Sequence, residues 1–153
     1  MCVYNERGIW NLATIDTANG RLERIETPYT DLTFVRAKPG RAFVRAGSRE
    51  EPLSITELDL QTRKTTVYQR QSNTDIEPAF YSKSEAIEFP TENGLTAHGF
   101  YFPPTNRDFA GPADEKPLLL VKSHGGPTSA TIASLTLGIQ YWTSRGFAVL
   151  DVN

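Results

Sequence analysis

Hydrophobic and polar residues alternate in short stretches over residues 1–80, a pattern that is typical of β-strands with one buried face. In the segment 9–16, Trp10, Leu12 and Thr14 are expected to share one face of a strand. Asn19-Gly20 follows and predicts a tight turn, because both residue types tolerate a positive φ. Further strands are expected at residues 22–25, 32–35, 42–46, 53–60 and 65–68, with a second turn at Lys38-Pro39-Gly40. This part of the chain is therefore predicted to fold into antiparallel hairpins.

One sequence pattern recurs within this region at an offset of 43 residues. Leu12, Ile15 and Asp16 correspond to Ile55, Leu58 and Asp59. Each set continues through a polar turn into a second short strand. A repeat of about 40–45 residues with four strands per unit is typical of a β-propeller blade. Two unrelated hairpins with the same spacing would give the same pattern, so the repeat by itself leaves both interpretations open.

The pattern changes near Phe80. Residues 86–89 and 97–102 predict two strands, which are separated by the turn residues Glu92-Asn93-Gly94. Residues 118–121 form a continuous apolar run, which predicts a strand buried on both faces of a sheet. The sequence pattern of this half is typical of an α/β domain.

A helix is predicted over residues 130–144, and its apolar face would carry Ile132, Leu135, Ile139 and Trp142. Thr128 or Ser129 would cap its start, and Gly146 stands where a glycine commonly ends a helix. Residues 147–152 predict a second buried strand. A strand, a helix and a strand at this spacing predict a right-handed parallel crossover.

The segment Lys122-Ser123-His124-Gly125-Gly126-Pro127-Thr128 carries the candidate chemistry, and we call residues 124–126 the glycine loop. Adjacent glycines allow a sharp turn and bring backbone N–H groups close to a ligand. Preorganised N–H donors stabilise a developing oxyanion, and His-Gly-Gly motifs after a strand supply one such donor in α/β-hydrolases.

Two other interpretations of the glycine loop remain open at this point. The loop could serve only to redirect the chain, with His124 hydrogen-bonded to the loop itself. It could also bind phosphate, because the N-terminus of a helix attracts anions. The chain contains neither Gly-x-Gly-x-x-Gly nor Gly-x-x-x-x-Gly-Lys, the two common glycine-rich nucleotide motifs.

Composition and charge exclude several classes of partner. The 16 basic and 18 acidic side chains give a net charge of −2, and no cluster of Lys and Arg predicts nucleic-acid binding. No apolar run approaches the roughly 20 residues that span a bilayer, and no signal peptide is visible. One cysteine, Cys2, cannot form an internal disulfide, and two separated histidines do not form a zinc motif. We expect a cytoplasmic protein with neither metal nor cofactor.

The second half resembles the start of the peptidase domain of the prolyl oligopeptidase family. The residues that carry the resemblance are Glu85–Phe89, Asn93-Gly94, His98-Gly99-Phe100-Tyr101, Pro103-Pro104, Leu120–Pro127, Gln140-Tyr141-Trp142 and Arg145–Val149. The form His-Gly-Gly-Pro is closer to the acylaminoacyl-peptidase branch. The resemblance implies a mixed fold, in which residues 1–80 are about two C-terminal blades of a β-propeller. Residues 81–153 would then be the first strands and helix of an α/β-hydrolase domain.

The resemblance also implies roles for individual residues. Gly126, with Gly125 as the second candidate, would donate a backbone N–H to the tetrahedral intermediate. His124 stands where dipeptidyl-peptidase relatives use a tyrosine hydroxyl, and we expect it to brace the loop instead. His98 is expected to be a structural residue in a strand. Ser123 is not the nucleophile, because nothing like Gly-x-Ser-x-Gly surrounds it.

No Gly-x-Ser-x-Gly occurs anywhere in the 153 residues, so the Ser/Asp/His triad is absent. We therefore expect a fragment, inactive alone, of a serine peptidase that cleaves peptides or acyl-peptides through an acyl-enzyme. A carboxylesterase-type α/β-hydrolase fragment and a non-catalytic, propeller-like binding module are the alternatives. The sequence predicts neither the substrate specificity nor the oligomeric state.

Overall fold

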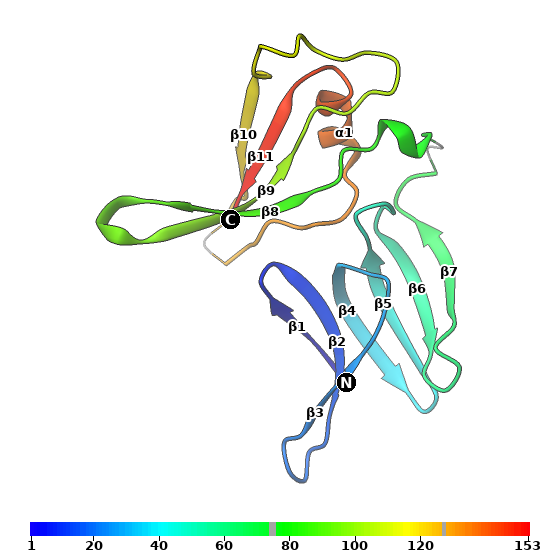
Figure 1. Cartoon of the computed structure of the whole chain (residues 1–153). Helices are drawn as coiled ribbons and strands as arrows, with labels where there is room; N and C mark the ends of the chain where they lie inside the picture. The colour runs from blue at the N-terminus through cyan, green and yellow to red at the C-terminus, as the bar shows by residue number, and fades with distance from the viewer. Residues whose placement is uncertain (74–75, 127) are drawn as a thin grey trace. The chain divides into compact units, whose positions relative to one another are not determined.

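The computed structural model describes residues 1–73, 76–126 and 128–153, which form two compact units. Unit 1 comprises residues 1–73 together with residues 133–135, and unit 2 comprises the remainder (Figure 1). Within the described residues, no helix is long and apolar enough to cross a membrane.

Unit 1 consists of two antiparallel sheets whose strands follow chain order. The first contains β1 (Cys2–Glu6), β2 (Ile9–Ile15) and β3 (Leu22–Ile25). The second contains β4 (Asp31–Lys38), β5 (Arg41–Gly47), β6 (Ser54–Asp59) and β7 (Thr65–Arg70). The predicted strands and hairpins of this region are confirmed. A four-stranded antiparallel meander is consistent with part of a β-propeller.

The 43-residue repeat reappears in the backbone of two hairpins, β2–β3 and β6–β7. Asp16 and Asp59 each accept a backbone hydrogen bond two residues ahead, from Ala18 and Gln61, with N–O distances of 2.9 Å. Each turn ends on a left-handed residue, Gly20 with φ +72° or Arg63 with φ +61°. Asn19 does not adopt a positive φ, so only the glycine of Asn19-Gly20 uses the freedom that predicted the turn.

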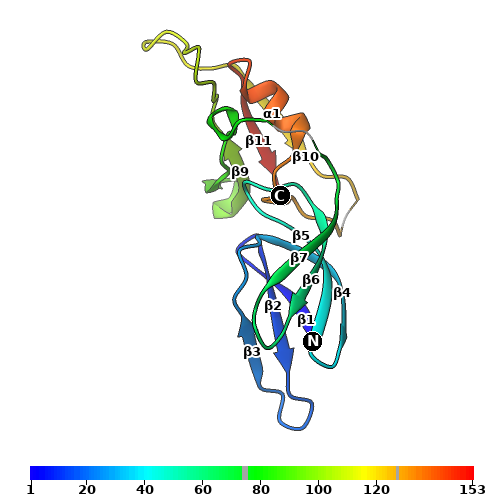
Figure 2. The ribbon, with the colours of Figure 1, turned by 90° about the vertical axis from the view of Figure 1, so that its right-hand side faces the viewer.

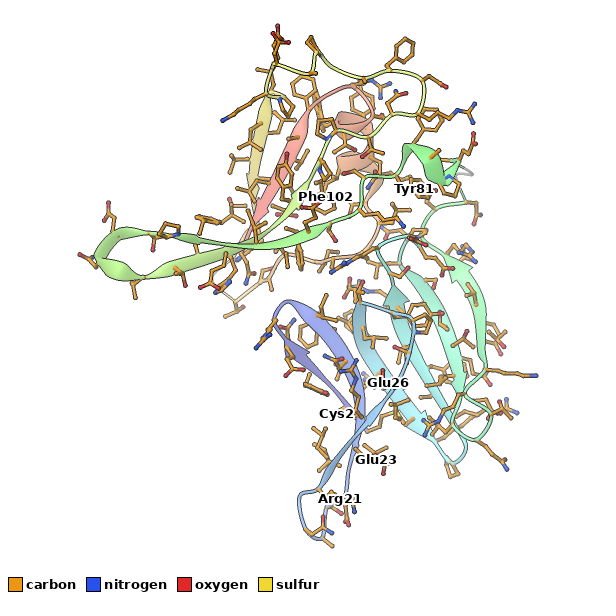
Figure 3. All side chains as sticks on the ribbon, in the orientation of Figure 1. Cys2, Arg21, Glu23, Glu26, Tyr81 and Phe102 are labelled. Carbon is orange, nitrogen blue, oxygen red and sulfur yellow. The ribbon has the colours of Figure 1, made fainter. Side chains whose placement is uncertain are left out.

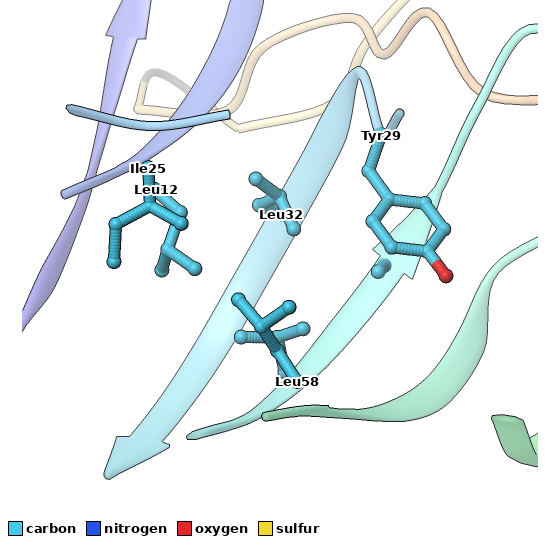
Figure 4. Packing of buried hydrophobic residues seen from close by; sticks show 7 residues of the cluster. Leu12, Ile25, Tyr29, Leu32 and Leu58 are labelled. Carbon is cyan, nitrogen blue, oxygen red and sulfur yellow. The ribbon is translucent and has the colours of Figure 1, made fainter. Parts of the chain in front are cut away.

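The two copies differ in burial. Leu12 is buried and its counterpart Ile55 is exposed, whereas Ile15 is exposed and Leu58 is buried. The repeat therefore specifies the turn and the hairpin register, while the packing of each sheet decides which side chains face inward. The core of unit 1 joins both sheets and is formed by Leu12, Ile25, Tyr29, Leu32, Val44, Ala46 and Leu58 (Figure 4).

Strand β3 is an edge strand, and it and its flanking residues carry exposed charged side chains. Arg21, Glu23 and Glu26 are exposed around this strand (Figure 3), and Arg24 forms an ion pair with Glu26 at 3.0 Å. Charges on an edge strand oppose pairing with another chain.

Unit 2 contains one four-stranded sheet in the order β10-β11-β9-β8. The strands are β8 (Glu85–Pro90), β9 (Thr96–Phe102), β10 (Leu119–Ser123) and β11 (Ala148–Val152). The pair β10–β11 is parallel, as predicted, and the pairs β11–β9 and β9–β8 are antiparallel. A short 3₁₀ turn, η1 (Pro78–Phe80), precedes β8, and a second, η2 (Glu92–Gly94), connects β8 to β9. Helix α1 (Leu137–Thr143) packs against β11 (Figures 1 and 2).

The predicted helix 130–144 is wrong at its start, because α1 begins only at Leu137. Residues 133–135 instead belong to unit 1, where the N–H of Leu135 donates to the carbonyl of Ser48 at 2.8 Å. Thr136 is the N-cap residue, so Thr128 and Ser129 do not cap this helix. Contacts of residues 133–135 inside unit 1 override the helical periodicity, and Trp142 of the predicted apolar face is 43% exposed.

The predicted glycine cap at the other end of α1 is confirmed. Gly146 has φ +90°, and its N–H donates to the carbonyl of Thr143 at 3.3 Å. The N–H of Phe147 reaches back to Trp142 at 3.3 Å, and the two rings pack edge to face. This pair of hydrogen bonds with its hydrophobic contact is the Schellman motif.

The prediction that residues 118–121 are buried on both faces is wrong. Leu118, Leu119 and Val121 are 71%, 52% and 65% exposed. Strand β10 is one of the two edge strands of its sheet and pairs only with β11 among the described residues. By contrast β11, which lies between two strands, is largely buried as expected.

Candidate functional site

The glycine loop begins where the edge strand β10 ends. Ser123 is the last residue of β10, and His124 starts the loop. Gly126 adopts φ +73°, a left-handed backbone conformation that residues other than glycine rarely adopt. Gly125 has no such requirement, and a Cβ added at either glycine would meet open space. The predicted Pro127 of this motif lies outside the described residues.

Both loop glycines are exposed, and among the described residues their N–H groups have no hydrogen-bond acceptor. His124 is half-buried, and its Nδ1 lies 3.4 Å from the carbonyl oxygen of Gly125. This contact is at the long limit of a hydrogen bond and joins neighbouring residues. A bracing role for His124 therefore stays a prediction.

An ion pair holds the end of β10 to β11. The Nζ of Lys122 lies 2.6 Å from Oδ2 of Asp151, whose side chain is 2% exposed. The two residues are direct partners in the parallel register. The other oxygen of Asp151 is buried without a partner among the described residues. A buried carboxylate is costly unless it is paired, so this contact favours one position for the strand end before the loop.

This ion pair was not predicted from the sequence. Its signal was available, since Lys122 and Asp151 are the charged residues in two otherwise uncharged strands. On the far side of the loop, the N–H of Thr131 donates to Oδ1 of Asn153 at 3.1 Å. The glycine loop is thus flanked by two side-chain contacts to the end of β11.

His98, the remaining candidate from the sequence, is not part of the glycine loop. His98 lies in β9 as predicted, where it is exposed and pairs in register with Glu88. Its backbone carbonyl accepts a hydrogen bond from the N–H of Asn153 at 2.9 Å.

No group of three His, Cys, Asp or Glu side chains suited to a metal ion occurs in the part of the chain that the structure describes. A cavity of about 590 Å³ lies in unit 2 between residues 104–106, 109–111 and 143–146. Phe109 and Arg145 are among its lining residues, and the glycine loop is not.

Comparison with known proteins identifies peptidases. No family model and no curated protein matches the chain. Among solved structures, a puromycin-hydrolyzing peptidase of Mycobacterium tuberculosis matches 96% of the chain with a TM-score of 0.89 and 30% identity. A puromycin hydrolase matches the same share with a TM-score of 0.84 and 34% identity. A prolyl endopeptidase matches 99% with a TM-score of 0.77, and its 14% identity shows the fold alone.

The chain spans only 22–23% of the length of these three proteins. This share fits the expectation that the sequence is part of a longer protein. The assignment to the acylaminoacyl-peptidase branch stays a prediction. Over nearly its whole length, the chain is similar in structure to segments of a puromycin-hydrolyzing peptidase, a puromycin hydrolase and a prolyl endopeptidase, in agreement with the resemblance that the sequence motifs indicated.

Proposed function

We propose that the chain is the part of a serine peptidase that joins the last propeller blades to the start of an α/β-hydrolase domain. In this proposal the glycine loop supplies one donor of the oxyanion hole, through the backbone N–H of Gly126. The observation that carries it is the left-handed Gly126, three residues after the end of β10, in a chain similar to peptidases over 96% of its length.

The order of strands in unit 2 supports the hydrolase part of the proposal. In the topology that the resemblance implies, the strand before the glycine loop lies between β11 and the strand that ends in the nucleophile. Strand β10 has β11 on one side, and its other edge is unpaired within the described residues. That edge is where the nucleophile strand of the complete enzyme would pair.

The chemistry follows from what a tetrahedral intermediate requires. In the full enzyme, a serine outside these residues attacks the carbonyl of a peptide or acyl-peptide, and the carbonyl oxygen becomes an oxyanion. A backbone N–H held toward that oxygen stabilises the charge without reorganisation. In α/β-hydrolases the second donor is the N–H of the residue after the nucleophile. Gly126 would therefore supply half of the oxyanion hole.

The antiparallel sheets of unit 1 favour this proposal over a carboxylesterase fragment, which would not account for two consecutive blade-like sheets. Similarity to peptidases favours it over a non-catalytic binding module. Peptides and acyl-peptides are the proposed substrates. Because two similar proteins are described as hydrolysing puromycin, that compound is a useful second substrate in a test.

The test is the replacement Gly126→Val in the full-length enzyme. Valine cannot adopt φ +73° without strain, so the loop would shift and move the N–H. Loss of one oxyanion donor typically lowers kcat by about 10²–10³-fold. Turnover of a peptide p-nitroanilide and of puromycin would be measured against the wild type.

Gly111→Ala is the control. Gly111 lies outside the glycine loop and has an ordinary φ and open space around its Cβ position, so the alanine variant should leave the loop unchanged. We expect its turnover to stay within a few-fold of the wild type, since it adds one methyl group without backbone strain. Wild-type turnover in Gly126→Val would contradict the assignment of Gly126.

A further inference from the structure

Residues 133–135 lie between the glycine loop and helix α1, and yet they are part of unit 1. We call them the docked segment. Ala133, Ser134 and Leu135 are only 1%, 1% and 6% exposed. The docked segment occupies a specific site in unit 1, because three consecutive residues outside any helix or strand are buried to this degree.

Two hydrogen bonds hold the docked segment. The hydroxyl of Ser134 donates to Oδ2 of Asp31 at 3.3 Å, and Asp31 is 1% exposed. The N–H of Leu135 donates to the carbonyl of Ser48 at 2.8 Å. Each bond joins residues more than 80 positions apart in the chain, so tertiary folding alone brings them together.

Gly47 provides the space for this seat. A Cβ at position 47 would lie 3.0 Å from Cβ of Ser134, 3.2 Å from Leu53 and 3.4 Å from the carbonyl oxygen of Glu51. Gly47 does not have a positive φ, so its backbone would accept another residue. Glycine is therefore required at this position by the close approach of Ser134, the nearest neighbour, and of Leu53.

We propose that Asp31, Gly47 and Ser134 are positioning residues that hold the glycine loop through the docked segment. Ala133 follows Gly126 by only seven residues, and Thr131 between them is bound to Asn153. Docking at residue 133 restrains the chain two residues from this contact, so it favours the Thr131–Asn153 hydrogen bond on the far side of the glycine loop. The catalytic consequence rests on the proposed role of Gly126.

Gly47→Val in the full-length enzyme tests the inference, because the valine side chain competes with Ser134 for the same space. Hydrogen–deuterium exchange would be followed at two amides, Leu135 in the docked segment and Thr131 on the loop side. We expect both to exchange at least about tenfold faster, since their hydrogen bonds are lost when the segment leaves its seat. We also expect kcat to fall with KM unchanged. Gly111→Ala is the control, because Gly111 has an ordinary φ and open surroundings.

Ser134→Ala is a milder second variant, for use if Gly47→Val does not fold. It keeps the Cβ packing and removes the donor to Asp31, and the exchange of both amides should rise a few-fold. Faster exchange at Leu135 with no change at Thr131 would overturn the positioning role. So would an unchanged kcat in an undocked variant, provided that Gly126→Val lowers kcat. If Gly126→Val keeps full turnover, the proposed function fails, and the exchange data alone decide whether the segment holds the loop.

Discussion

At the scale of single residues, Asp31 shows how burial changes the chemistry of a side chain. Burial raises the pKa of its carboxyl above the ordinary value of 3.8, and this effect outweighs the hydrogen bond from Ser134 and the positive charge of Arg45. Its second oxygen is buried without a partner among the described residues. Asp31 is therefore held in the docking contact at a cost to its ionised form.

This raised pKa predicts a pH dependence of stability. Between pH 4 and the folded-state pKa, the folded protein retains a proton that the unfolded chain has lost, so the free energy of unfolding falls as the pH rises. Asp31→Asn keeps an acceptor for Ser134 and cannot ionise, so this part of the pH dependence should disappear. Urea denaturation at several pH values between 4 and 7 would measure it. Equal pH dependence in the variant and the wild type would show that Asp31 is not the group responsible.

At the scale of elements, one glycine within α1 and one that follows it have opposite conformational requirements. Gly138 lies inside the helix with an ordinary φ, and a Cβ there would meet nothing within 4 Å. Gly146 follows the helix with φ +90° and makes the Schellman hydrogen bond to Thr143. The same substitution should therefore have opposite effects at the two positions.

Gly138→Ala should stabilise α1 by about 0.5–1 kcal/mol, because alanine loses less backbone entropy in a helix. Gly146→Ala should destabilise it by about 1 kcal/mol, because alanine is strained in a left-handed conformation. Amide exchange within α1 of the full-length enzyme would slow in the first variant and accelerate in the second. Changes of the same sign at both positions would contradict this account of the helix end.

At the scale of the whole molecule, the edge strands β3 and β10 differ in the side chains that they expose. Strand β3 carries exposed charges, whereas β10 exposes Leu119 and Val121 at an edge that is unpaired in the part of the chain that the structure describes. An exposed apolar edge strand is a template for pairing with another chain. In the full enzyme, the proposed nucleophile strand would cover this edge.

We predict that the 153-residue chain by itself aggregates or remains partly molten, and that β10 is the main cause. Val121→Lys should reduce the association, because a charge on the edge opposes pairing. The exposed Leu95→Lys, in the β8–β9 hairpin, is the control for added charge alone. Sedimentation velocity and thermal melting would measure the effect. A monodisperse wild-type chain with a sharp transition would refute the prediction.

The same chain should have no hydrolase activity, because no Gly-x-Ser-x-Gly nucleophile motif is present in it. Without a nucleophile, only weak effects from binding and from the oxyanion donor remain. Incubation of the pure chain with a peptide p-nitroanilide would check this. Turnover that a serine-directed fluorophosphonate blocks would show the opposite.

Local patterns determined most of the elements. The alternation in residues 9–16, the turn at Gly20 and the helix cap at Gly146 depend on contacts within a few residues, and all three were predictable. The glycine loop was also visible in the sequence, because its residue types follow a strand directly. The tertiary structure alone decided the rest. Helix α1 starts seven residues later than predicted, because residues 133–135 bind Asp31 and Ser48. Strand β10 is exposed because it lies at an edge of its sheet, and hydrophobic periodicity does not indicate which strands pair.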